Sequence, residues 1–179
     1  TGRMAAAETL GVQQHEGVGV TIKHFCCNNR ETNRMFNNSH VPVRALREIY
    51  LKGFEIAVTE GRPLSVMTSY NLMNGIHTAC NYELIQNVLR DEWGFEGVVM
   101  SDWYSSFPVD DMAALGEGLD AVYPEAVSHM CVYAGCDWQM PGCMANIDDI
   151  VHSVAQGRLS RGDLQACGMN ILRFMMQIM

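Results

Sequence analysis

The chain has 179 residues, of which 48% are hydrophobic and 18% are charged, as in ordinary folded proteins rather than disordered ones. Its formal net charge of -8 argues against a nucleic-acid-binding protein. No apolar run reaches the roughly 18 residues that a membrane span requires. We therefore expect one globular domain, with no nucleic-acid partner and no membrane insertion.

Apolar periodicity predicts helices and strands that alternate along the chain. Helices are predicted at about residues 3–15, 42–58, 82–92, 124–134, 145–156 and 161–178, with a further helical stretch beginning at Pro108. Strands are predicted at 18–24, 64–69, 97–101 and 137–140, with polar loops at 28–40 and 71–80. Asn81 and Ser160 are expected to cap the helices that follow them. The helix at 42–58 should bury an apolar face formed by Leu46, Ile49, Tyr50, Phe54 and Val58.

This alternation predicts an α/β fold with βαβ units and a parallel sheet. Four strands are too few for a complete (β/α)8 TIM-type barrel, which takes about 250 residues. Two architectures remain open, a partial barrel of about four βα units and a small open α/β sheet. Residues 1–7 resemble the inside of a helix rather than a natural start, so we expect a fragment of a longer protein.

The seven cysteines lack the spacing of a zinc site, and Cys26 and Cys27 are adjacent. We interpret them as buried free thiols of a protein in a reducing cytoplasm. We accordingly expect no metal and no cofactor.

One carboxylate stands out because it directly follows an apolar run. Val98, Val99 and Met100 predict a strand buried on both faces, and Asp102 comes just after it. A carboxylate is costly to bury, and α/β barrels place their chemistry at the carboxyl ends of strands. Trp103 beside it could stack on a sugar. Asp102 is thus the first candidate for a catalytic group, although it could instead cap a helix or pair with Lys23.

Polar residues also follow the other predicted strands, and in a parallel barrel these ends converge on one face. They are Lys23 and His24 on the first, Tyr70 on the second, and Asp137 and Trp138 on the fourth. A cation beside Asp102 would keep it ionised, as a nucleophile requires.

Each of these residues also has a purely structural interpretation. His24 could be a satisfied core histidine, and Tyr70 and Trp103 could serve packing. Asp137 and Trp138 are interpreted as structural, and Glu31 is expected to pair with a neighbouring arginine.

An ordered series of motifs resembles family 3 of the glycoside hydrolases, especially its β-glucosidases. The segments are Lys23-His24-Phe25, Asn29, Glu31, Arg34, residues 44–51, residues 67–71, Asn74-Gly75, residues 89–95 and Ser101-Asp102-Trp103. The resemblance is close over about residues 1–110 and looser over 135–179. Residues 116–134 look longer or more divergent than the usual linker of the family.

The resemblance implies a retaining glycosidase that hydrolyses terminal non-reducing β-D-glucosyl residues. Asp102 falls on the nucleophile, which forms a covalent glycosyl-enzyme that water then hydrolyses. Lys23, His24 and Arg34 fall on residues that bind the sugar hydroxyls. Met67 and Tyr70 fall on residues that line the same subsite, and Trp103 on the aromatic beside the nucleophile. The implied partner is a β-glucoside or oligosaccharide substrate.

The chain also departs from the family. Retaining hydrolysis needs a second carboxyl group roughly 5–5.5 Å from the first. In the β-glucosidases this group comes from a separate α/β-sandwich domain, to which nothing here corresponds. The first half of the barrel is also missing, so we interpret residues 1–179 as the C-terminal half of the barrel domain. Cys26 and Cys27 after Phe25 disfavour the N-acetylglucosaminidase branch.

Other functions remain open on these grounds. The chain could belong to a β-xylosidase or another exo-β-glycosidase of the family, or be a catalytically incomplete carbohydrate-binding fragment. A lysine Schiff-base lyase using Lys23 is a further alternative. A half barrel exposes strand edges and apolar flanks, so we expect a dimer or a missing barrel half to complete the fold.

Overall fold

The computed structural model of the chain describes residues 1–106 and 126–179. Its helical segments are α1 (Gly2–Val12), η1 (Arg34–Phe36), α2 (Val43–Ala45), η2 (Leu46–Tyr50), α3 (Lys52–Gly61), η3 (Thr78–Cys80), η4 (Glu83–Glu92), α5 (Ser128–Ala134), α6 (Met144–Ala155) and α7 (Arg161–Ile178). Its strands are β1 (Thr21–Phe25), β2 (Asn38–Ser39), β3 (Ser65–Thr68), β4 (Leu72–Met73), β5 (Ile76–His77) and β6 (Val98–Met100). The described part of the chain is thus an α/β fold.

The central sheet is parallel and has the strand order β1-β3-β6. Ser65 of β3 lies opposite Thr21 of β1 and Val98 of β6. Beyond β6, Trp138 forms a single parallel bridge to Met100. The fourth strand predicted at 137–140 is therefore only one bridge long. The segment is still joined to β6 and its end by backbone hydrogen bonds, because Asp137 and Trp138 donate to the Val99 carbonyl and the Trp138 carbonyl accepts from the Ser101 N–H.

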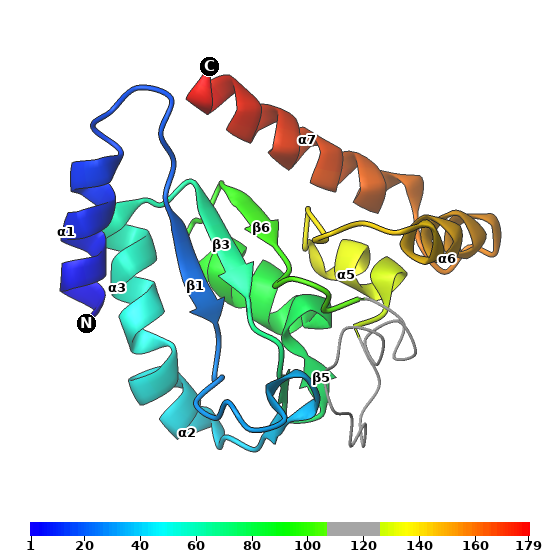
Figure 1. Ribbon diagram of the computed structural model, residues 1–179, viewed down its shortest axis with the longest axis horizontal. Helices are drawn as coiled ribbons and strands as arrows, with labels where there is room; N and C mark the ends of the chain where they lie inside the picture. The colour runs from blue at the N-terminus through cyan, green and yellow to red at the C-terminus, as the bar shows by residue number, and fades with distance from the viewer. Residues whose placement is uncertain (107–125) are drawn as a thin grey trace.

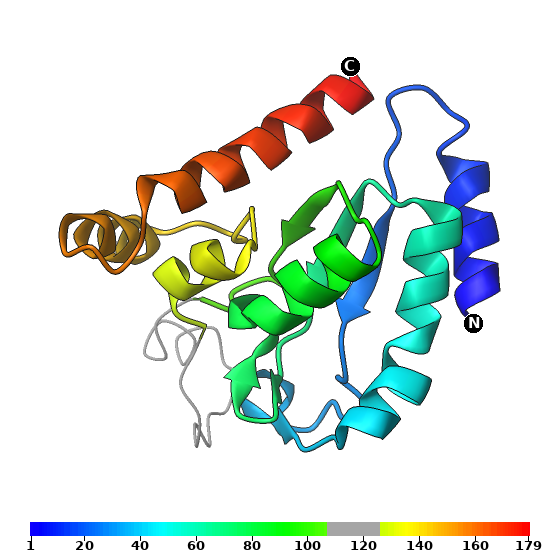
Figure 2. The ribbon, with the colours of Figure 1, turned by 180° about the vertical axis from the view of Figure 1, so that it is seen from behind.

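Helices cover one face of this sheet. Figure 1 shows the strands with no helix in front of them, whereas Figure 2, from the opposite side, shows η4 in front of the strands and α3 running alongside β1. Phe25, Val66 and Val99 point from the three strands into the core on the helical side. The Phe25 ring lies 5.0 Å from that of Phe54 on α3. Helix packing on this face thus accounts for the apolar side chain that each of the three strands buries there.

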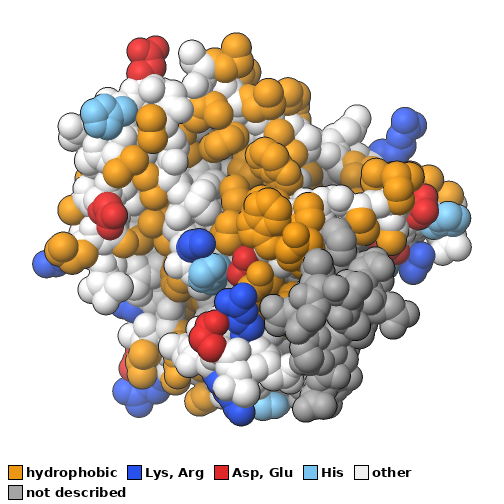
Figure 3. All heavy atoms as spheres, viewed as in Figure 1, with side chains coloured by type: hydrophobic (Ala, Val, Ile, Leu, Met, Phe, Trp, Pro, Cys, Tyr) orange, Lys and Arg blue, Asp and Glu red, His pale blue; other side chains and the backbone are white. Residues whose placement is uncertain are grey.

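The opposite face carries much exposed apolar surface. Figure 3 shows hydrophobic side chains gathered over the centre of this face, beside a cluster of charged groups and a histidine. Trp103 and Trp138 are both about half exposed. Contiguous exposed apolar area of this kind is uncommon on a folded monomeric chain.

The helix predicted over 42–58 runs through α2, η2 and α3 as far as Gly61. It packs on α1, where a Cβ on Gly61 would lie only 2.8 Å from the Cα atom of Ala6. Leu46, Tyr50 and Phe54 pack on the core and Val58 lies within it, as predicted. Ile49 is 69% exposed, so its assignment to the buried face is wrong. Because η2 is π-helical, its wider turn departs from the 3.6-residue period used for the prediction.

The loops predicted at 28–40 and 71–80 contain a second sheet, with the order β2-β4-β5. Strands β4 and β5 pair antiparallel through Asn74 and Gly75, which both have positive φ angles. Asn-Gly is the preferred sequence for such a two-residue turn. The Asn74 side chain accepts a hydrogen bond from the Val41 N–H at 2.8 Å, which holds the hairpin to the segment that follows β2. The expectation of two plain loops and only parallel strands is therefore wrong here.

Both predicted caps are present. Ser160 Oγ accepts a hydrogen bond from the Asp163 N–H at 3.1 Å, and Asn81 Oδ1 accepts one from the Leu84 N–H at 3.0 Å. Helix α1 ends at Val12, before the predicted boundary. The helical stretch predicted from Pro108 and residues 124–125 lie outside the described residues. Among the residues described, no helix is long and apolar enough to cross a membrane.

Candidate active site

The carboxyl ends of β1 and β6 bring a histidine and a carboxylate together. His24 Nε2 lies 3.5 Å from Asp102 Oδ2. The Asp102 side chain is only 7% exposed, whereas that of His24 is 37% exposed. The carboxylate is therefore withdrawn from bulk water but remains next to a group that a ligand can reach.

The backbone around Asp102 is fixed by its neighbours. The Asp102 Oδ1 atom accepts a hydrogen bond from the Trp103 N–H at 2.8 Å. The preceding Ser101 donates its N–H to the Trp138 carbonyl at 2.8 Å, and its Oγ accepts from the Met140 N–H at 2.9 Å. Sequence reasoning missed Ser101 as a positioning residue. A small polar residue at the end of an apolar strand was the available signal.

Asp137 binds Arg90 and the backbone of β6 and is not part of the His24–Asp102 pair. Its Oδ2 atom accepts from an Arg90 guanidinium nitrogen at 2.6 Å and from the Val99 N–H at 2.8 Å. Burial raises the pKa of Asp137 above its ordinary value of 3.8, although Arg90 and the hydrogen bonds act in the opposite direction. These contacts agree with the structural interpretation of Asp137.

Arg34 and Tyr70 also lie together. The Arg34 guanidinium carbon is 4.8 Å from the centre of the Tyr70 ring, within the range of a cation–π contact. Arg34 also pairs with Glu31 at 3.0 Å, so the expected pairing of Glu31 with an arginine is present. Tyr70 is buried, so its ring forms a fixed platform for the guanidinium.

The remaining predicted residues differ in exposure. Met67 is buried and lies in register with Met100 of β6, whereas Trp103 is 50% exposed. Lys23 is exposed and lines, together with His24 and Cys27, a hollow of about 450 Å³. His24 and Asp102 thus form one pair and Arg34 and Tyr70 another, while the exposed Trp103 adjoins Asp102 directly.

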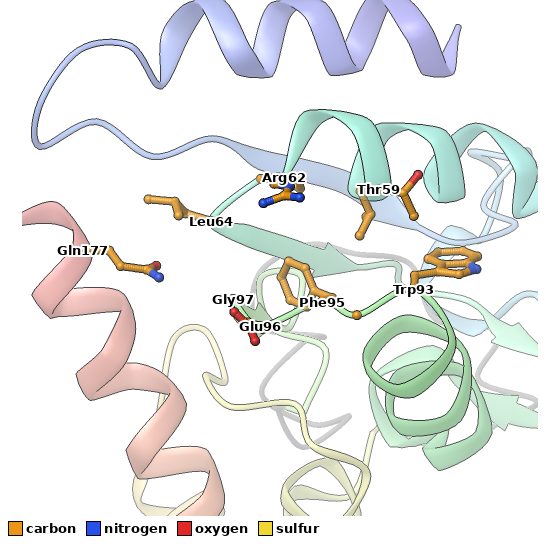
Figure 4. Close-up of a pocket in the computed structure, with 11 residues that line it drawn as sticks. Thr59, Arg62, Leu64, Trp93, Phe95, Glu96, Gly97 and Gln177 are labelled. Carbon is orange, nitrogen blue, oxygen red and sulfur yellow. The ribbon is translucent and has the colours of Figure 1, made fainter.

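A second hollow, of about 480 Å³, lies at the opposite ends of the strands. Leu64 and Gly97, which immediately precede β3 and β6, line it together with Phe95 (Figure 4). Gln177 of α7 faces it from across the gap. Because parallel α/β folds place their chemistry at the carboxyl ends of strands, this hollow is not the candidate site.

Comparison with known proteins assigns the family. The model described as the glycosyl hydrolase family 3 N terminal domain matches residues 1–174. The chain belongs to this family. A β-glucosidase of Ruminococcus albus is 46% identical over 176 residues, which cover 98% of this chain and 18% of that protein. An exo-α-(1→6)-L-arabinopyranosidase of Bifidobacterium breve is 38% identical over 164 residues, covering 90% of this chain and 19% of that protein.

Solved structures agree with the family assignment. β-Glucosidase 3B of Thermotoga neapolitana, in complex with glucose, superposes with a TM-score of 0.84 at 41% identity. The match covers 98% of this chain and 23% of that one. This family 3 chain therefore spans less than a quarter of the length of these relatives.

Proposed function

We propose that this chain is part of a retaining β-glucosidase, in which Asp102 is the nucleophile that attacks the anomeric carbon. The observation that carries the proposal is the buried Asp102 carboxylate at the carboxyl end of β6, with His24 of β1 3.5 Å away. A nucleophilic carboxylate must stay ionised and aimed, and the Trp103 N–H and Ser101 contacts restrict its position. Attack forms a glycosyl-enzyme, which water then hydrolyses.

The sugar subsite is proposed to surround this carboxylate. Lys23, His24 and Arg34 would donate hydrogen bonds to the sugar hydroxyls, for which their side chains are suited. Met67 and Tyr70 would form the wall, and Trp103 would offer an exposed ring for stacking. The exposure of Lys23, His24 and Trp103 supports these roles because a ligand can reach all three.

We further propose that residues 1–179 form the C-terminal half of a (β/α)8 barrel domain. The parallel order β1-β3-β6, continued by the bridge at Trp138, supports about four consecutive barrel units. The exposed apolar face opposite α3 and η4 would then be the inner face of the barrel (Figure 3). The relatives are long enough to supply the other half, since the chain covers 18% of one of them.

The general acid/base is proposed to come from a part of the protein outside this chain. Retaining hydrolysis requires two carboxyl groups, so the chain alone should not turn over. We expect negligible release of nitrophenol from p-nitrophenyl β-D-glucoside by the 179-residue chain, and robust release by a longer protein that contains it. Strong activity of the isolated chain would contradict the proposal.

A second candidate is a related exo-glycosidase, which the similarity to an arabinopyranosidase favours. The discriminating experiment compares kcat/KM of the longer protein on p-nitrophenyl β-D-glucoside, β-D-xyloside and α-L-arabinopyranoside. We expect the glucoside to be preferred. A preference for either pentoside would replace the substrate assignment while leaving Asp102 as nucleophile. If the longer protein bound these sugars but hydrolysed none of the three substrates, a carbohydrate-binding function without catalysis would be indicated instead.

A further inference from the structure

Three sulfur atoms converge between the end of β1 and the hairpin that begins with β4. Cys27 Sγ lies 3.5 Å from Cys26 Sγ, and Met73 Sδ lies 3.8 Å from Cys26 Sγ and 4.0 Å from Cys27 Sγ. All three residues are buried. The sulfurs form a nearly equilateral triangle, and the point equidistant from them is about 2.2 Å from each.

Sulfur bonds to first-row metals are close to this length, since zinc–thiolate bonds measure about 2.3 Å. We infer that Cys26, Cys27 and Met73 form a trigonal binding site for a soft cation of the Cu(I) class. Thiolate and thioether ligands select such cations over hard ones. A structural zinc ion prefers four ligands, and no group of three or more His, Cys, Asp or Glu residues in the described part of the chain is arranged for a metal.

The backbone holds these ligands in place without a metal. Adjacent side chains of an extended strand point to opposite faces, but Cys27 has a φ angle of 67°, which breaks that alternation. The Cys26 carbonyl accepts a hydrogen bond from Ser69 Oγ at 2.8 Å, and the Cys27 carbonyl accepts one from Ser39 Oγ at 2.9 Å. Both thiols are thus preorganised on the side of Met73.

The site also has an entry route. Cys27 lines the hollow of about 450 Å³ that Lys23 and His24 also line, so a cation can reach the Cys27 sulfur from solvent. Binding forms one metal–sulfur bond to each residue and breaks the S–H bonds of the two cysteines. Two protons pass to solvent, and neither metal nor sulfur changes oxidation state.

The test is an anaerobic titration of the chain with Cu(I) against bathocuproine disulfonate. The background carries Cys80→Ser and Cys131→Ser, because those two sulfurs also lie 3.5 Å apart. In this background we expect the chain to bind one equivalent of Cu(I) tightly. Cys27→Ser should abolish it and Met73→Leu should weaken it by at least about tenfold. The matched controls Cys143→Ser and Met144→Leu, at less buried positions, should leave the affinity unchanged.

X-ray absorption of the Cu(I)-loaded background chain tests the geometry even if a variant fails to fold. We expect three sulfur neighbours at about 2.2–2.3 Å, and two at a shorter distance in Met73→Leu. Fewer than three sulfurs in the background chain would overturn the inference. So would an unchanged affinity in Cys27→Ser, equal affinity for Zn(II), or equal Cu(I) affinity when the chain is unfolded in urea.

Discussion

The buried pair of Arg90 and Asp137 supports β6, and Arg90→Met should destabilise the fold strongly. The Asp137 side chain is fully buried and that of Arg90 is 12% exposed, with 2.6 Å between the charged atoms. Arg90 also donates to the carbonyls of Gly97 and Gly135 at 3.1 and 3.3 Å. Removing one partner of such a pair leaves a buried charge uncompensated, which costs about 3–5 kcal/mol.

The loss should depend on pH in a defined direction. Burial already raises the pKa of Asp137 in the folded chain above its ordinary value of 3.8. Protonation of Asp137 therefore stabilises the folded chain fully below pH 3.8, and this stabilisation is lost as pH rises through the pKa of the folded state. Without Arg90 the pKa of Asp137 rises further, so the stabilisation by protonation persists to higher pH. Each unit of additional shift returns about 1.4 kcal/mol once Asp137 is protonated. Arg90→Met should therefore lose less stability at about pH 5 than at about pH 8.

Urea unfolding followed by tryptophan fluorescence measures both effects. The matched control is Arg47→Met, because Arg47 pairs with Glu92 at the same 2.6 Å but both side chains are nearly half exposed. We expect less than about 1 kcal/mol for this exposed pair. If Arg90→Met cost no more than Arg47→Met, or if its cost were the same at both pH values, the argument from burial would be refuted.

Two further predictions concern other buried groups. Burial lowers the pKa of His77 from 6.5 to about 4, so the free energy of unfolding should fall by up to roughly 3 kcal/mol as pH drops through this range. His77→Phe should flatten that decline in urea titrations, whereas the exposed His152→Phe should not; an unchanged slope in His77→Phe would contradict the assignment. Ser101→Ala orphans the Met140 N–H and should cost about 1–3 kcal/mol and lower kcat in the longer protein. Ser153→Ala, at a buried serine whose hydroxyl has no hydrogen-bond partner in the described part of the chain, should have little effect, and equal losses in both variants would contradict the positioning role.

The sequence was sufficient for the α/β alternation and the strand-end residues because buried parallel strands have a local signal. Val98 to Met100 form such a run, and the polar residue that follows marks the strand end. The β4–β5 hairpin was missed although Asn74-Gly75 is a turn signal, because its strands are only two residues long. Strands this short carry no readable alternation.

Contacts between distant segments could not be predicted from local patterns. The 3.5 Å contact between His24 and Asp102 is an exception, because the carboxyl ends of parallel strands lie at the same edge of the sheet. The tie of Ser101 to Met140 and the approach of Met73 to Cys26 join segments separated by 39 and 47 positions. Neither has a spacing signature, since the partners are placed by the fold alone.

The central claim is that Asp102 is the nucleophile of a retaining β-glucosidase. The most direct test treats the longer protein with a 2-deoxy-2-fluoroglucosyl inactivator, which traps the glycosyl-enzyme, and maps the labelled peptide by mass spectrometry. We predict one sugar bound to Asp102, and no label in Asp102→Ala. A label on any other carboxylate, or near-normal turnover by Asp102→Ala, would contradict the claim.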